Sequence, residues 1–92
     1  MRLRWAESAR AAYEQSIRFI AEQDAFAADL VRDRVSRSMQ LIASHPGMGT
    51  PIQGGRVRRY PIPRTGHCVN YVETSQGITI VRWYRQKQNV RC

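Results

Sequence analysis

The carboxyl-terminal half of this chain carries nearly all of its net charge. Residues 51–92 hold eight basic residues against a single acid, Glu73, whereas residues 1–50 hold seven basic and six acidic residues. All the basic residues except Lys87 are arginines, whose planar forks bind carboxylate and phosphate groups in a fixed geometry. The second half is therefore expected to present a basic surface to an anionic partner, either nucleic acid or an acidic protein. The alternative is a solvated basic face that serves only solubility.

Groups that could transfer protons are few. Cleavage of a phosphodiester bond needs a base for the attacking hydroxyl and cations for the developing charge. Arg82 and Arg85 could supply the cations, and His67 is the one plausible base, although a half-buried histidine more often has a structural role. Tyr84 would have to titrate far below its ordinary pKa of about 10 to act as a base. The inventory therefore favours binding over catalysis.

The two cysteines, Cys68 and Cys92, make no disulfide framework and no zinc-ligand pattern. Cys68 also forms no nucleophile pair with His67, because neighbours on a strand point to opposite faces. We expect no metal, no cofactor and no structural disulfide.

The first half of the chain predicts one short strand and two helices. Leu3 and Trp5 alternate with arginines, as on a strand with one apolar face. Residues 7–22 and 25–44 follow helical periodicity, and Asp24 can cap the second helix. Their apolar stripes are Ala9, Tyr13, Ile17 and Ile20, then Ala28, Val31, Val35, Met39 and Ile42. Helices joined this closely form an antiparallel hairpin.

The second half predicts a loop and three strands. Residues 47–55 are rich in glycine and proline and are expected to form a loop. Strands are expected over 57–60, where Pro61 and Pro63 end the first, over 68–72, and over 78–84. Residues 74–77 form the turn between the last two, with Trp83 facing inward and Arg82 outward.

The expected order is β-α-α-β-β-β. It predicts an α+β two-layer domain over residues 1–92, with the helix hairpin packed on a mostly antiparallel sheet. No apolar run is long enough to cross a bilayer, and the amino terminus lacks the apolar stretch of a signal peptide. A cytoplasmic protein with no membrane partner is expected.

Three stretches, in this order, resemble the RelE/ParE toxin superfamily. Ile42-Ala43-Ser44-His45-Pro46-Gly47-Met48-Gly49 resembles the end of the helix hairpin in ParE toxins. Gly66-His67-Cys68-Val69-Asn70-Tyr71 is similar to their third strand, and Ile80-Val81-Arg82-Trp83-Tyr84-Arg85-Gln86 to their last, with Gln88-Asn89 continuing the similarity. Arg85 departs from the histidine common at its position, and the tail after it is short.

The resemblance implies a toxin of a type II toxin–antitoxin system. ParE toxins poison DNA gyrase and are neutralised by a cognate antitoxin, here expected to supply an acidic, partly disordered segment. RelE-type members instead cleave messenger RNA on the ribosome, which is the alternative. Cys68 stands near the position of their third-strand arginine, and Val90-Arg91-Cys92 offers no terminal tyrosine or histidine.

The resemblance and the charge distribution together give a set of candidate contact residues. Arg58, Arg59 and Arg82, as strand residues with the option of facing outward, are the candidates to meet carboxylates of the antitoxin. The candidates for target or antitoxin binding are Arg58, Arg59, Arg82, Tyr84 and Arg85, with His67 as a weaker one. No residue is assigned a catalytic role, and direct binding of nucleic acid is left open.

Overall fold

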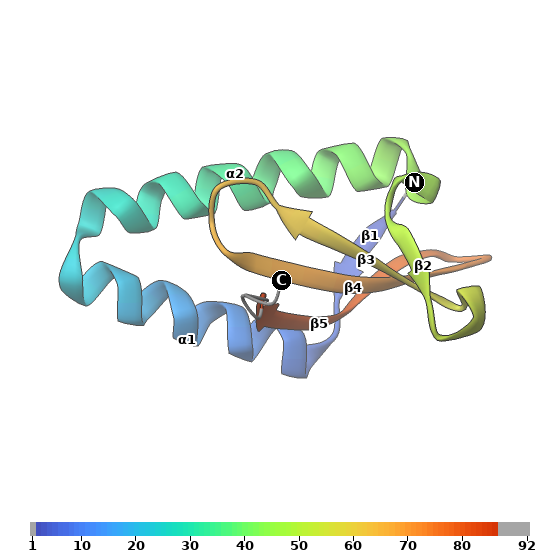
Figure 1. Cartoon of the computed structure of the whole chain (residues 1–92), viewed down its shortest axis with the longest axis horizontal. Coiled ribbons are helices and arrows are strands. Elements are labelled where there is room, and N and C mark those ends of the chain that lie inside the picture. The colour runs from blue at the N-terminus through green and yellow to red at the C-terminus, as the bar shows by residue number, and fades with distance from the viewer. Residues whose placement is uncertain (1, 87–92) are drawn as a thin grey trace, which may run out of the picture.

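The structure is a computed structural model that describes residues 2–86. Expectations that concern Cys92 and the tail from Lys87 onward lie outside these residues. Within them the chain forms two long helices, two short 3₁₀ turns and a five-stranded sheet (Figure 1). The elements are β1 (Leu3–Trp5), α1 (Glu7–Gln23), α2 (Ala25–Ser44), η1 (Pro46–Met48), β2 (Thr50–Ile52), η2 (Gln53–Gly55), β3 (Val57–Ile62), β4 (His67–Thr74) and β5 (Gly77–Arg85).

The sheet has the strand order β1-β5-β4-β3-β2. Neighbouring strands from β2 to β5 pair antiparallel, whereas β1 pairs parallel with β5. The parallel pair joins the first strand of the chain to the last, so the whole helix hairpin lies between them in sequence. This confirms the expected two-layer α+β fold with a mostly antiparallel sheet.

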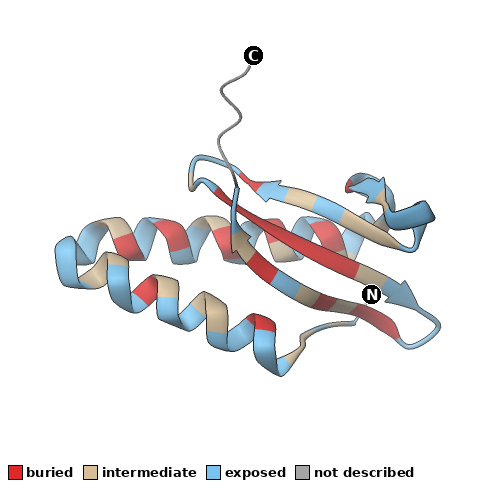
Figure 2. Cartoon of the chain, turned by 60° about the horizontal axis from the view of Figure 1, so that its bottom comes forward, coloured by how far each residue is buried: buried red, intermediate tan, exposed pale blue. Residues whose placement is uncertain are grey.

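The helix hairpin covers one face of the sheet and leaves the other open. The buried residues of both helices come from the predicted stripes: Ala9 and Ile17 on α1, and Ala28, Val31, Val35 and Ile42 on α2. They meet the buried side chains of the central strand β4 and of β5 (Figure 2). The tip of the hairpin projects beyond the end of the sheet in both views. We call the two sides of the sheet the helix side and the open face.

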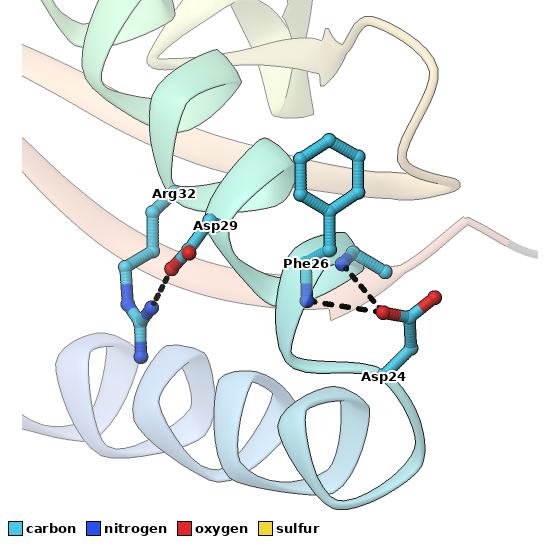
Figure 3. A network of polar contacts seen from close by, with 5 residues as sticks. Asp24, Phe26, Asp29 and Arg32 are labelled. Atoms are coloured by element: carbon cyan, nitrogen blue, oxygen red, sulfur yellow. Dashed lines mark hydrogen bonds and ion pairs between the residues drawn. The ribbon is translucent and has the colours of Figure 1, made fainter.

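The turn between the helices is held by the expected cap. The Asp24 carboxylate accepts hydrogen bonds from the backbone N–H groups of Phe26 and Ala27, at 3.0 and 3.2 Å. One turn on, Arg32 is ion-paired with Asp29 at 2.7 Å (Figure 3). The cap satisfies backbone donors that the first turn of a helix leaves unpaired. No helix among the described residues is both long and apolar enough to span a membrane.

Two expectations for the middle of the chain are wrong. Residues 47–55 are more than a loop, because Thr50–Ile52 forms strand β2 against β3. Strand β3 does not end at Tyr60 but runs through Pro61 to Ile62. Strand β2 pairs only as far as Arg59, so β3 has a free edge beside Pro61, where the missing N–H of proline costs no ladder bond.

A β-bulge in β5 sets which residues face the helices. The partners of Asn70 and Tyr71 are Arg82 and Ile80, so Val81 has no partner of its own. Strict alternation would place Ile80 and Trp83 on opposite faces, but the extra residue shifts the later part of the strand by one. Both side chains are consequently buried on the helix side, and Arg82 is exposed on the open face.

Candidate functional site

Five side chains from three strands form a cluster on the open face, which we call the open-face cluster: Arg59, Cys68, Asn70, Arg82 and Tyr84. Register places Asn70 directly between Arg59 on β3 and Arg82 on β5. The Tyr84 hydroxyl donates a hydrogen bond to Asn70 Oδ1 at 2.9 Å. The Arg82 guanidinium lies over the Tyr84 ring, 4.7 Å from its centre, which holds the cation in place. The structure thus brings together three of the predicted site residues.

The two side chains of this cluster that could lose a proton, Tyr84 and Cys68, have raised pKa values. Burial raises the pKa of Tyr84, and the nearby Cys68 adds to this, while Arg59, Arg82 and the hydrogen bond to Asn70 act in the opposite direction. Burial likewise raises the pKa of Cys68, with Arg59 opposing it. Tyr84 and Cys68 therefore stay protonated near neutral pH, and neither provides a base or a thiolate nucleophile.

Arg58 lies on the helix side, unlike its neighbour Arg59. Its guanidinium donates hydrogen bonds to the backbone carbonyl oxygens of Gly47 and Gly49, at 3.1 and 2.7 Å. Two residues that are adjacent on a strand cannot both face outward. Of the two, Arg59 takes the outward-facing option on the open face, whereas the Arg58 side chain anchors the segment after α2.

His67 and Arg85 also lie on the helix side, where they are paired across β4 and β5. The His67 ring stacks on Trp83 with 4.7 Å between ring centres, and its Nδ1 lies 3.1 Å from the carbonyl oxygen of Thr65. Burial lowers the pKa of His67, Arg85 lowers it further, and the bond to Thr65 opposes both. His67 is accordingly neutral near pH 7, and its ring is part of the packed layer under α1.

A groove of about 660 Å³ opens where the hairpin projects past the sheet. Its lining includes Ser16, Phe19 and Ile20 of α1 and His67, Trp83 and Arg85 of the sheet. Trp83 donates a hydrogen bond from Nε1 to Ser16 Oγ at 3.0 Å, and Phe19 is 60% exposed at the edge. We call it the helix-side groove; its lining is largely apolar and also includes the charged residues Arg85 and Asp24.

The sheet separates the groups that a nuclease mechanism would combine. Arg82 and the Tyr84 hydroxyl, which bonds Asn70, are on the open face, whereas His67 and Arg85 are on the helix side. Tyr84 also borders the helix-side groove. Among residues 2–86, no three His, Cys, Asp or Glu side chains come close enough to hold a metal ion. The open-face cluster offers hydrogen-bond donors and fixed positive charge, which suit binding of an anion.

Sequence reasoning missed the residue at the centre of this cluster, Asn70. It is only 5% exposed, in a stretch where apolar neighbours suggest plain sheet packing. One signal was present, since an amide in the middle of a strand needs hydrogen-bond partners. Its partner Tyr84 and its flanking arginines become visible only once the register of three strands is known.

Comparison with known proteins gives one family and one fold. The model of a family described as "ParE toxin of type II toxin-antitoxin system, parDE" matches residues 3–90. A solved structure of the chromosomal ParDE toxin–antitoxin system from P. aeruginosa superposes with a TM-score of 0.80 at 18% sequence identity, covering 95% of this chain and 97% of that chain. No curated protein matches significantly.

Proposed function

Since this chain belongs to the ParE toxin family of type II toxin–antitoxin systems, we propose that it arrests growth by binding DNA gyrase, without catalysing a reaction. The match of the family over residues 3–90 carries this proposal. Gyrase as the target follows from the resemblance to ParE toxins. The surface proposed to contact it is the exposed basic part of the sheet, including Arg59, Arg82 and Tyr84.

The absence of catalysis is supported by what surrounds the arginines. In-line cleavage of RNA needs a proton acceptor within hydrogen-bond reach of the attacking hydroxyl. Beside Arg82 the described residues offer an amide, a protonated phenol and a protonated thiol. His67 could accept a proton, but it lies on the other side of the sheet, stacked on Trp83. A ribosome-dependent nuclease is therefore the less favoured reading.

We propose further that a cognate antitoxin neutralises the chain by covering the helix side. The large apolar side chains that are exposed in residues 2–86 all lie on the helices or just after α2: Phe19, Phe26, Leu30, Leu41 and Met48. An antitoxin segment that folds on binding could place apolar anchors in the helix-side groove and a carboxylate against Arg85. The net charge of +8 would speed association with an acidic segment.

Two assays on the purified chain test the proposal. The first measures DNA supercoiling by gyrase, with and without the cognate antitoxin. The second measures integrity of messenger RNA on translating ribosomes. We expect inhibition of supercoiling, relieved by antitoxin, and intact RNA. Arg82→Ala should weaken inhibition, whereas Arg18→Ala, at an exposed site on α1, should not. Site-specific RNA cleavage that is lost in a folded His67→Gln variant would overturn the proposal.

A further inference from the structure

The open-face cluster contains a buried donor for which residues 2–86 supply no acceptor. Asn70 is 5% exposed, and its amide oxygen is occupied by the Tyr84 hydroxyl. Among residues 2–86, no hydrogen bond from the Asn70 Nδ2 group is found. Buried polar groups in folded proteins are nearly always paired. The amide N–H groups of Asn70 are therefore placed to meet an acceptor that residues 2–86 do not supply.

Two arginines that form no ion pair within residues 2–86 flank this donor. Arg59 and Arg82 are the cross-strand neighbours of Asn70, so their backbones are about 10 Å apart across one intervening strand. Neither forms an ion pair within the described residues, where the ion pairs are those of α2. Arg82 is held by the Tyr84 ring at 4.7 Å. An anion above Asn70 could accept from both guanidinium groups and from the amide together.

The basic character extends across the open face. Arg4 of β1 lies beside Thr79 of β5, with Leu3 and Trp5 packed toward the core, so Arg4 projects to the open face. In the described part of the sheet, none of the residues that alternate onto this face is acidic. Positive charge that recurs over several strands suits a polyanion, with one negative charge in each repeating unit, better than a single carboxylate.

The large exposed apolar residues lie away from this face, so any contact made by the open face has to rest on its polar and charged groups. All five large ones within residues 2–86 lie on the helix side or just after α2, and protein interfaces are usually centred on such anchors. The open face offers arginines, an amide, threonines and one tyrosine ring, and its apolar residues, such as Val57 and Val72, are half-buried. Sites for nucleic-acid backbones combine these groups in this way.

We infer that the open face binds the phosphate backbone of DNA directly, with one phosphate between Arg59 and Arg82 and hydrogen-bonded by Asn70. This goes beyond the proposed function, because it gives the chain a contact with the DNA that gyrase handles and not only with gyrase. Backbone contacts of this kind carry no base specificity.

Fluorescence anisotropy of a short labelled oligonucleotide tests the inference, using single-stranded and duplex forms as separate arms. The key variant is Asn70→Asp, which keeps the shape of the side chain and its bond from Tyr84 but places a carboxylate between the two arginines. We expect it to weaken DNA binding at least about tenfold at low salt, because the new carboxylate would pair with the two arginines in place of a phosphate. Gln40→Glu makes the same charge change on α2 and should alter affinity less than about twofold.

Arg82→Gln is a second variant, at an exposed position, that tests the same site if Asn70→Asp impairs folding. Loss of one phosphate contact should reduce the slope of log Kd against log salt concentration by about 1. The inference is wrong if DNA fails to bind at roughly 50 mM salt, if Gln40→Glu weakens binding as much as Asn70→Asp, or if Arg82→Gln leaves the salt slope unchanged. It is also wrong if polyglutamate binding, and not DNA binding, is lost in Asn70→Asp. The DNA-binding assay contains no gyrase. Its failure would therefore leave the proposed inhibition of gyrase, which the supercoiling assay measures, undecided by this experiment.

Discussion

The hydroxyl of Tyr71 ties the end of the helix hairpin to the sheet, and its removal should be costly. Tyr71 is fully buried. It donates to the carbonyl oxygen of Pro46 at 2.7 Å and accepts from the N–H of Gly49 at 2.9 Å. Tyr71→Phe deletes both bonds with almost no change in shape. It also leaves the N–H of Gly49, a buried residue, without a partner.

The magnitude follows from these contacts. Each neutral hydrogen bond contributes about 0.5–1.5 kcal/mol, and a buried group left unpaired costs about 1–3 kcal/mol. We therefore expect Tyr71→Phe to lower the free energy of unfolding by about 2–3 kcal/mol. For a domain of this size, each 1 kcal/mol lowers Tm by roughly 4–8 °C.

Urea and thermal unfolding followed by circular dichroism measure this change. Tyr60→Phe is the matched control, because Tyr60 is half-buried and its hydroxyl has no hydrogen-bond partner in the described structure. It should change stability by less than about 0.5 kcal/mol. Equal, small effects of the two variants would refute the role assigned to Tyr71.

Three further predictions concern the same framework. Gly49→Ala should destabilise by about 1–3 kcal/mol, since the added Cβ would lie 2.8 Å from a tyrosine oxygen, whereas Gly47→Ala, with nothing within 4 Å, should be nearly neutral in the same unfolding assay. The lowered pKa of His67 means that the unfolded chain binds more protons just below pH 6.5; stability should fall as pH drops through this window, and His67→Gln should flatten the decline in urea titrations run at several pH values. Asp24→Ala should cost about 1 kcal/mol by loss of the helix cap, and an unchanged urea midpoint would contradict it.

The helices could be read from the sequence because their signals are local. The apolar stripes repeat at helical spacing, and the carboxylate of Asp24 stands where a cap is needed. Strand β2 could not be read, because Pro51 and the surrounding glycines have the composition of a loop. Its three residues form a strand only because β3 offers an edge.

The faces of the last strand depend on long-range pairing. The residue pattern predicted Trp83 inward and Arg82 outward. Simple alternation cannot bury both Ile80 and Trp83. The β-bulge at Val81 lets Ile80 and Trp83 face the same side of the sheet, and only the register against β4 reveals this bulge. The same register separates His67 from Arg82 and creates the cluster around Asn70.

Titration of the purified chain against a fixed amount of gyrase tests the central claim most directly. A toxin that acts by binding must be present in amounts comparable to its target, whereas a catalyst acts when it is far scarcer. We predict that inhibition of supercoiling rises with the ratio of chain to gyrase and saturates near equivalence. We also predict that antitoxin, added after inhibition, restores activity. Gyrase that stays fully active beside excess chain, while ribosome-bound messenger RNA is cut by trace amounts of it, would contradict the account.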